Sequence, residues 1–458
     1  MAPALGYWDI RGLAEPIRLL LRYLGADFQE KLYHPGPAPD FDSNEWLEEK
    51  FKLGLEFPNL PYYIDGDFKL TQSAAILEYI ADTHNMIPSC KKQRAVLHML
   101  FNTSFDLVMK FGIICYSPDF DNLRGSFLKS LPDSLRTFEE YLGDKTWLTG
   151  DKINYPDFSL CELLNELEKF EPSCLSEFPK LKAYLTRFEN LPELKEYIFS
   201  EEFKKRDCMV PFEENPKKEL REIDDEINDL RSAFEDFSND ADYLGQQIRL
   251  LLTYCGEKFD QELYEVGPAP EFSREQWLSK KYNLGLDFPN LPYLIAGDFK
   301  LTHSTAILEY IADRNNMLPK SPEEQATLLM INLAAVDVRN HVYYLTFGPD
   351  YEKNKVEYMK NLPTEIKSLA DYLGDKKFFS GEKINYPDFN IYDLLILLRT
   401  YSSDCLDAFP SLQAYIKRFE EIPSMKKYMN SPAYIHRPFT DTMARRGYCL
   451  DWKEENTN

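Results

Sequence analysis

The residues of this chain that could carry out chemistry stand where predicted strands end and predicted helices begin. Tyr7 closes a short apolar segment, and its phenol there could donate a hydrogen bond to an anion. Ser73 opens an apolar run that predicts a helix over 73–81, and the N-terminus of a helix favours an anionic group. Taken singly, a tyrosine at a strand end or a serine at a helix start is usually structural, so the surrounding pattern must decide.

The eight cysteines form neither a metal-binding set nor a disulfide framework. They contain no C-x-x-C pair and are too widely spaced for a compact set of disulfides. The N-terminal residues lack the basic region and apolar run of a signal peptide. We therefore expect reduced thiols and a cytoplasmic protein. The cysteines are Cys90, Cys115, Cys161, Cys174, Cys208, Cys255, Cys405 and Cys449.

The balance of charge argues against two classes of partner. The 458 residues include 76 Asp and Glu against 53 Lys and Arg, and the net charge of −23 would repel nucleic acid or an anionic membrane. No apolar stretch approaches the roughly 20 residues that span a bilayer. With 44% hydrophobic residues the chain can still build large cores, and its length predicts three or four domains.

The chain contains a duplication of a large unit. Residues 39–86 match residues 270–317 without a gap, with 32 of 48 positions identical at a constant offset of 231. The same offset places Asn154-Tyr155-Pro156-Asp157-Phe158 on Asn385-Tyr386-Pro387-Asp388-Phe389. This period is far too long for a solenoid, so a whole two-domain unit is repeated. We call residues 1–212 copy 1 and residues 242–458 copy 2.

Each copy is predicted to consist of an α/β module followed by an all-helical module. In the first module, 17–24 predicts a helix that ends at a glycine, and 62–64 and 68–70 flank an Asp-Gly-Asp hairpin turn. In the second, Asn154 and Asp157 precede an apolar run as a variant of the capping box. The predicted domains are 1–83 and 84–212 in copy 1, and 242–314 and 315–458 in copy 2.

The two copies are joined by an acidic linker, residues 213–241, with eleven acidic and four basic side chains. Its apolar residues are spaced 3, 4, 3, 4 and 3 apart from Leu220 to Phe237, which favours an amphipathic helix. A solvated charged linker is the alternative interpretation.

Four segments of copy 1 occur in a fixed order: Gly6-Tyr7-Trp8-Asp9-Ile10-Arg11-Gly12-Leu13, Trp46 with Lys50, Phe57-Pro58-Asn59-Leu60-Pro61, and Thr71-Gln72-Ser73. Together they resemble the mu-class glutathione S-transferases. The resemblance covers copy 1 and nearly all of copy 2. It implies two tandem units, each with a thioredoxin-like N-terminal domain and a helical C-terminal domain. It also implies a dimer that binds glutathione between the domains.

The resemblance implies an enzyme of detoxification that conjugates reduced glutathione to small hydrophobic electrophiles. Tyr7 matches the family's catalytic tyrosine. A free thiol has a pKa near ~8.5, so a hydroxyl donor aimed at the sulfur is needed to stabilise the thiolate at neutral pH. Two alternatives stay open: a non-catalytic protein that binds hydrophobic ligands, and a structural protein of the crystallin type.

Further site residues carry over from the resemblance position by position. Gln72 and Ser73 match contacts to the γ-glutamyl carboxylate, and Trp46 and Lys50 match contacts to the glycyl end. Leu60 precedes a proline that is cis in the family, and its backbone would pair with the cysteinyl residue. The implied glutathione contacts are Trp8, Leu13, Trp46, Lys50, Asn59, Leu60, Gln72, Ser73, Asp106 and Asp337, and the implied electrophile pocket is Leu13, Met109 and Tyr116.

Copy 2 departs from the pattern at the catalytic position. The offset places Ser238 on Tyr7, His303 on Gln72 and Phe347 on Tyr116. We expect copy 2 to be inactive, because three aspartates in 236–242 would be costly to bury in a central strand. Ser238 or the nearby Tyr243 could still supply a hydroxyl.

The resemblance leaves two assemblies open. Phe57 and Phe288 match a phenylalanine that inserts into the neighbouring subunit in the family. The linker could let the two copies of one chain form an internal pseudo-dimer, which would place Asp337 at the copy 1 site beside Asp106. Alternatively, two chains form a homodimer. The family's arginine near Asp106 is replaced by Val108 in copy 1 but is present as Arg339 in copy 2.

Overall fold

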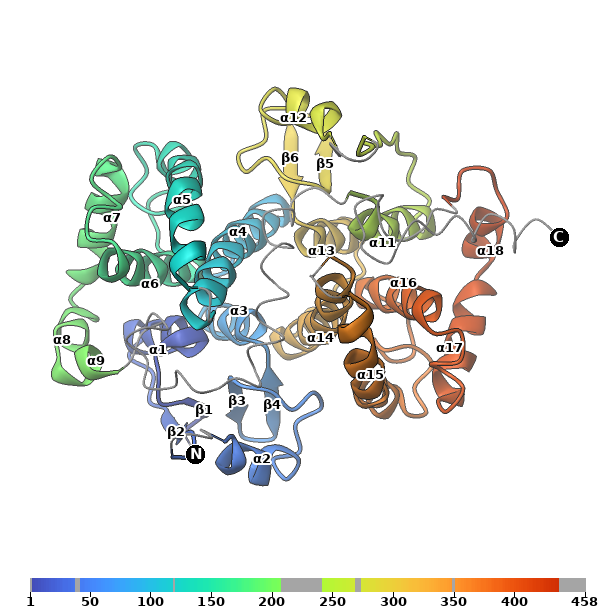
Figure 1. The fold of residues 1–458 in the computed structure, drawn as a ribbon, viewed down its shortest axis with the longest axis horizontal. Coiled ribbons are helices and arrows are strands. Elements are labelled where there is room, and N and C mark those ends of the chain that lie inside the picture. Colours follow the sequence, from blue (N-terminus) through green and yellow to red (C-terminus); the bar gives the residue numbers. More distant parts are fainter. Residues whose placement is uncertain are drawn as a thin grey trace. The chain divides into compact units, whose positions relative to one another are not determined.

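The computed structural model describes residues 2–37, 42–117, 120–206, 241–267, 273–347 and 351–435 (Figure 1). The chain divides into two units. Unit 1 comprises Met1–Ile227 with Pro319–Met330, and unit 2 comprises Asn228–Leu318 with Ile331–Asn458. The predicted linker, apart from its last residue Ala241, and Ser238 with it lie outside the described residues.

The sheet of unit 1 has four strands in the order β2-β1-β3-β4. β1 is parallel to β2 and antiparallel to β3, which pairs with β4 in the predicted hairpin. β1 is buried along its three middle residues, because it is a central strand. The strands are β1 (Ala4–Trp8), β2 (Gln29–Tyr33), β3 (Tyr62–Asp65) and β4 (Phe68–Thr71).

Along the chain, short helices connect these strands and follow the last of them. The predicted helix over 17–24 is α1 (Glu15–Tyr23), and Gly25 follows it with a φ of +63°. The predicted helix over 73–81 is α3 (Ser73–Thr83), with Ser73 as its first residue. Both predictions are confirmed. The remaining elements of this part are the short helix η1 (Gly12–Ala14) and α2 (Asn44–Lys50).

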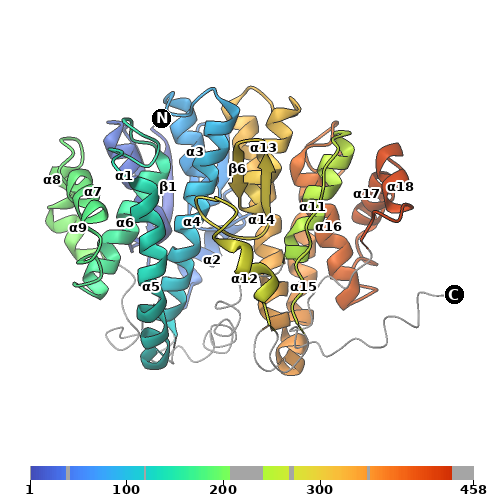
Figure 2. The ribbon, with the colours of Figure 1, turned by 90° about the horizontal axis from the view of Figure 1, so that it is seen from above.

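The second part of unit 1 is entirely helical. α4, α5 and α6 run side by side in Figure 2, and α6 also packs against α1, which joins the helical part to the sheet-containing part. The helices are α4 (Lys91–Tyr116), α5 (Phe120–Leu142), α6 (Tyr155–Phe170), α7 (Pro179–Glu189), α8 (Lys195–Ile198) and α9 (Glu201–Lys205).

The predicted capping box begins α6. Asp157 Oδ2 accepts a hydrogen bond from Asn154 N at 2.8 Å, and Asp157 Oδ1 accepts from Leu148 N at 2.9 Å and from the Tyr184 hydroxyl at 2.7 Å. Burial raises the pKa of Asp157 to about 6, although these three donors lower it. Asn385 and Asp388 form the same box in unit 2. The carboxylate therefore secures a buried helix start in both copies.

We expect Asp157→Ala to lower the free energy of unfolding of unit 1 by about 2–3 kcal/mol, because it leaves buried donors without an acceptor. Denaturant unfolding followed by tryptophan fluorescence measures the change. The matched variant Asp388→Ala should destabilise unit 2 by a similar amount and leave the transition of unit 1 in place. An unchanged midpoint in Asp157→Ala would contradict a stabilising cap.

The described residues of unit 2 repeat the main helices but form only part of the sheet. Its described strands β5 (Tyr293–Ala296) and β6 (Phe299–Thr302) form an antiparallel pair, and no described residue forms a counterpart of β1 or β2. Residues 241–243 lie in a helix. The offset places the counterpart of β1 at 235–239, outside the described residues, so the prediction that no central strand runs there stays a prediction. The helices are α11 (Ala241–Tyr254), α12 (Glu275–Lys281), α13 (Ser304–Arg314), α14 (Pro322–Phe347), α15 (Tyr351–Leu373), α16 (Tyr386–Tyr401), α17 (Pro410–Glu420) and α18 (Pro423–Met429).

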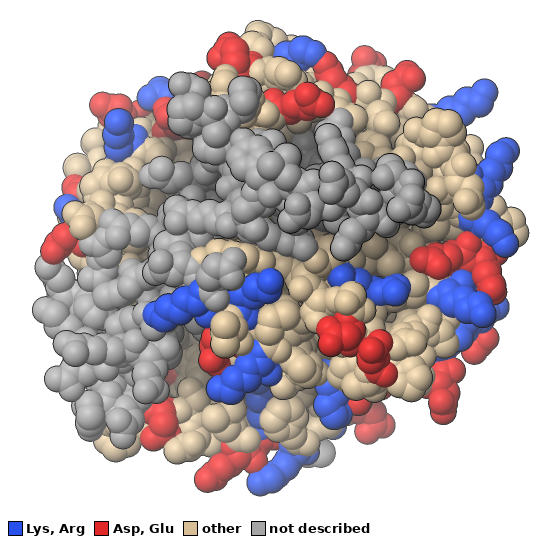
Figure 3. Space-filling model, turned by 45° about the vertical axis from the view of Figure 1, so that its right-hand side comes forward, with Lys and Arg blue, Asp and Glu red and all other residues tan. Residues whose placement is uncertain are grey.

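Two features of the described residues bear on the predictions that the chain binds neither nucleic acid nor an anionic membrane. Acidic and basic side chains are interspersed over the face in Figure 3. Among the described helices, none combines the length and the apolar composition that crossing a bilayer requires.

Candidate active site

Tyr7 lies at the end of the central strand β1, next to the loop that leads into α1. Its side chain is 7% exposed, and its hydroxyl oxygen accepts a hydrogen bond from Leu13 N at 3.2 Å. Gly12 has a φ of +41°, and a Cβ at this position would lie 2.9 Å from the Tyr7 oxygen. The glycine therefore permits the loop to approach the phenol closely, while the phenol keeps its own proton for donation.

The surroundings keep the Tyr7 phenol neutral. Burial raises the pKa of Tyr7, and the charge of Glu166 raises it further. The Leu13 N–H and the charge of Arg18 act in the opposite direction but do not outweigh burial. A phenol with a raised pKa is a hydrogen-bond donor at neutral pH and a poor general base.

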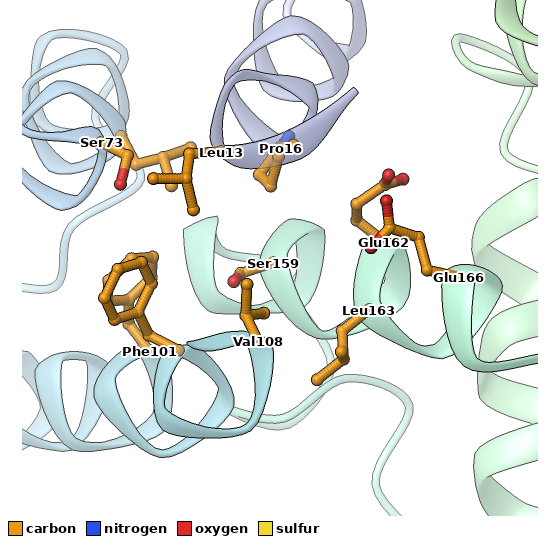
Figure 4. Close-up of a pocket in the computed structure, with 12 residues that line it drawn as sticks. Leu13, Pro16, Ser73, Phe101, Val108, Ser159, Glu162, Leu163 and Glu166 are labelled. Atoms are coloured by element: carbon orange, nitrogen blue, oxygen red, sulfur yellow. The ribbon is translucent and has the colours of Figure 1, made fainter. Parts of the chain in front are cut away.

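A cavity within unit 1 lies next to this loop. Leu13 and Ser73 line it from one side and face Phe101 and Val108 on α4 (Figure 4). Glu162 and Glu166 of α6 lie close together along the same cavity. The structure thus brings Leu13 and Ser73, two of the predicted site residues, to one cavity beside Tyr7.

The start of α3 has an unusual backbone. Gln72 precedes the helix with a φ of +74°, and its counterpart in unit 2, His303, has a φ of +68°. A residue other than glycine adopts this region only when its surroundings hold it there. Ser73, which is 8% exposed, follows as the first residue of α3. Both copies keep the bend, so the backbone at this position is retained even where the side chain differs.

Trp8 and Trp46 belong to an aromatic cluster. Trp46 is 6% exposed and packs with Tyr33, Leu55 and Tyr62, and Trp8 lies against the same cluster. Trp46 stacks on Tyr62 with 6.2 Å between the ring centroids. The two tryptophans are thus mainly packing residues in this structure, and their predicted contacts with a ligand stay predictions.

The remaining predicted contacts of the first module lie on α2 and before β3. Lys50, half-buried at the end of α2, has its ammonium 5.6 Å from the ring centroid of Phe51. Asn59 Oδ1 accepts a hydrogen bond from Leu60 N at 2.9 Å. The peptide bond between Leu60 and Pro61 is cis, as the resemblance implies.

The predicted residues on α4 do not line the described cavity. Asp106, Met109 and Tyr116 are half-buried. The residues of α4 that line the cavity are Phe101, Phe105 and Val108. Of the predicted electrophile pocket, only Leu13 lies at this cavity. Asp337 is half-buried in α14, and its proposed place at the copy 1 site stays a prediction.

A buried ion pair beside the cavity was not predicted. The fully buried Arg11 donates from Nε to Glu162 Oε1 at 2.7 Å and from Nη2 to Glu162 Oε2 at 2.5 Å. Its guanidinium also lies 4.1 Å from the ring centroid of Phe203. This pair links the loop after β1 to α6 and fixes the loop that contacts Tyr7.

Unit 2 also pairs a buried arginine with the carboxylate that corresponds to Glu162, but this arginine comes from a different position of the sequence. Glu162 corresponds to Asp393, whose Oδ2 lies 3.0 Å from Nη1 of the buried Arg339. Arg339 occupies the position of Val108, whereas the position of Arg11 is taken by Asp242. The two copies therefore differ at both positions in a compensating way. Each copy keeps one arginine paired with the buried carboxylate, Arg11 in copy 1 and Arg339 in copy 2. Comparing the two copies at these four positions could have revealed the pair.

Comparisons with known proteins match the same pair of domains twice along the chain. The family model of the glutathione S-transferase N-terminal domain matches residues 3–82 and 237–313, and that of the C-terminal domain matches 105–201 and 336–432. A glutathione S-transferase of Mesocricetus auratus and glutathione S-transferase Mu 1 of Bos taurus are each 48% identical over 203 residues, which is 44% of this chain and 93% of each relative. The solved glutathione S-transferase Blo t 8 is 37% identical with a TM-score of 0.40, covering 46% of this chain and 97% of that one.

Proposed function

This chain belongs to the glutathione S-transferase family of enzymes, and from that premise we propose that copy 1 conjugates reduced glutathione to hydrophobic electrophiles. The observation that carries the proposal is the state of Tyr7, a buried phenol with a raised pKa at the end of β1. Such a phenol stays protonated throughout the neutral range and can donate a hydrogen bond to a sulfur anion.

In the proposed reaction, the thiol of glutathione releases its proton to solvent water and the thiolate attacks an electrophilic carbon. A carbon–sulfur bond forms, and a leaving group departs with its electron pair or a strained ring opens. Tyr7 stabilises the thiolate as a hydrogen-bond donor, which raises the fraction of the nucleophile at neutral pH. Ser73 and the N-terminus of α3 would bind the γ-glutamyl carboxylate. No metal or bound cofactor takes part, and a cytoplasmic location supplies reduced glutathione.

We propose that copy 2 does not catalyse this reaction. The position of Tyr7 is taken by Ser238 and that of Gln72 by His303. Trp277, Asn290 and Ser304 correspond to Trp46, Asn59 and Ser73, so copy 2 keeps part of the peptide-binding set without the phenol.

Turnover of a chlorodinitrobenzene-type substrate with glutathione tests whether the chain is a transferase. The absence of turnover by the intact chain would favour the binding or structural alternatives.

A pair of serine variants separates the two copies. Ser73→Ala is expected to raise the KM for glutathione about tenfold, because it removes a hydrogen bond to a charged carboxylate. Ser304→Ala, the matched change in copy 2, should leave KM and kcat within about twofold of the intact chain. Equal effects of the two changes on KM would mean that both copies contribute to turnover.

We further propose a paired assembly, either between the two copies of one chain or between two chains. Light scattering distinguishes them, since an internal pair has the mass of one chain and a homodimer has twice that mass.

A further inference from the structure

The described part of unit 2 contains a groove along the free side of β5. Its walls are Tyr293–Ala296, residues 257–263 and one face of α11, which contributes Gly245, Ile248, Arg249 and Leu252. The strand edge at this groove is exposed: Ile295 is 44% exposed, and Tyr293 and Leu294 are half-buried. Among the described residues, no strand pairs with this edge of β5.

The corresponding space in unit 1 is filled by β1. There β1 pairs antiparallel with β3, and Leu5 and Gly6 lie in register with Tyr63 and Tyr62. Leu5 is 1% exposed, Tyr62 is 3% exposed and Tyr63 is 4% exposed. The duplication thus provides an internal template for a ligand of the groove, which is an extended apolar strand.

One position of this template has a strict steric requirement. A Cβ on Gly6 would lie 2.1 Å from the ring of Tyr62, so only glycine fits opposite that tyrosine. The offset of 231 places Tyr293 on Tyr62.

Tyr293 also has the same packing as Tyr62. It stacks on Trp277 at 6.2 Å, as Tyr62 stacks on Trp46 at 6.2 Å. Its hydroxyl oxygen lies 2.9 Å from that of Tyr264, and the matching distance from Tyr62 to Tyr33 is 3.1 Å. A strand that pairs with β5 in this register must therefore have glycine opposite Tyr293.

The chain's own sequence does not meet these requirements at the matching offset. Asp236 corresponds to Leu5 and Phe237 corresponds to Gly6, and both lie outside the described residues. An aspartate in place of a side chain that is 1% exposed would be costly to bury, and a phenylalanine cannot replace a glycine packed against a tyrosine ring.

We propose that this groove binds an extended segment of a partner protein by strand addition to β5. The segment carries glycine opposite Tyr293 and an apolar residue immediately before that glycine. Backbone hydrogen bonds to the edge of β5 supply affinity, and the Tyr293 ring together with Ile248 and Leu252 of α11 selects the sequence.

The test uses the full chain and a fluorescent peptide with the sequence of residues 2–10, which contains the β1 strand. Anisotropy should show binding of this peptide and at least about tenfold weaker binding of a peptide with valine in place of its glycine, because valine overpacks the site. Tyr293→Ala removes the ring and should reduce that discrimination to about twofold or less. Tyr62→Ala, the matched change in unit 1, should leave it unchanged.

A second measurement holds even if Tyr293→Ala fails to fold. A photoreactive phenylalanine in the peptide, followed by mass spectrometry, should label residues within 291–296. Absence of peptide binding would overturn the proposal, as would discrimination that survives in a folded Tyr293→Ala chain or labelling confined to 60–65 in unit 1. None of these outcomes bears on glutathione turnover, which the Tyr7 and Ser73 variants test separately.

Discussion

Tyr7→Phe is expected to lower kcat for glutathione conjugation by about 100-fold, the usual effect of removing one donor to an anion that must be stabilised. The substitution removes only the hydroxyl, and the ring continues to fill the buried end of β1. Steady-state turnover of a chlorodinitrobenzene-type electrophile at saturating glutathione measures it. Full activity of Tyr7→Phe would contradict the proposed role.

The pH profile distinguishes loss of the donor from a general structural effect. The quantity to follow is kcat/KM for the electrophile, measured at saturating glutathione. In the intact chain its rise with pH should occur well below about 8.5, the pKa of a free thiol. The rise belongs to the thiol of bound glutathione, because the pKa of Tyr7 is itself raised and its phenol stays neutral in this range. In Tyr7→Phe the rise should move up towards about 8.5. A structural defect would lower the rate at every pH without moving the profile.

Two further variants complete this experiment. Tyr63→Phe removes a hydroxyl from a buried tyrosine on β3, where copy 2 carries the apolar Leu294, and it should retain activity. Ser238→Ala in the Tyr7→Phe background tests whether copy 2 supplies the residual turnover. A further loss of activity in this double variant would show that Ser238 acts as a substitute donor.

The sequence predicted the parts of the site that depend on local signals. The glycine of the Asp-Gly-Asp turn sets the β3–β4 hairpin, because its φ of +61° suits glycine. Apolar residues at helical spacing follow Ser73 and predict that a helix starts there, as α3 does. The resemblance of residues 6–13 to the family places Tyr7 at the end of the first strand, and β1 ends at Trp8. Each of these signals spans fewer than about ten residues, which is the range over which periodicity and turn chemistry act.

The parts that local signals do not predict depend on contacts between distant segments. Arg11 and Glu162 are 151 residues apart, and neither belongs to a local pattern that distinguishes a buried ion pair from two solvated charges. Val108 lines the cavity while its neighbour Met109 does not. Which side of a helix as long as α4 faces a cavity depends on its packing against other helices, and its apolar residues alone do not determine this.

The second large effect is expected at the ion pair. Arg11→Leu should lower the free energy of unfolding of unit 1 by about 3–5 kcal/mol, because it leaves the Glu162 carboxylate buried without its partner. Burial raises the pKa of Glu162, and Arg11 lowers it. Without Arg11 the carboxyl should take up a proton more readily. The difference in stability between the variant and the intact chain should therefore narrow as the pH falls towards about 4.

The two copies provide a rescue for this variant. In unit 2 the arginine that pairs with the α16 carboxylate comes from the position of Val108. Val108 lines the same cavity as Glu162, so Arg11→Leu with Val108→Arg should recover at least about half of the lost stability. Denaturant unfolding followed by tryptophan fluorescence measures both changes. If Arg11→Leu alone is as stable as the intact chain, the pair does not hold the loop after β1. If the rescue fails while Arg11→Leu is destabilised, copy 1 requires its arginine in the loop after β1. The arginine of copy 2 at position 339 would then depend on further differences in the residues around α14.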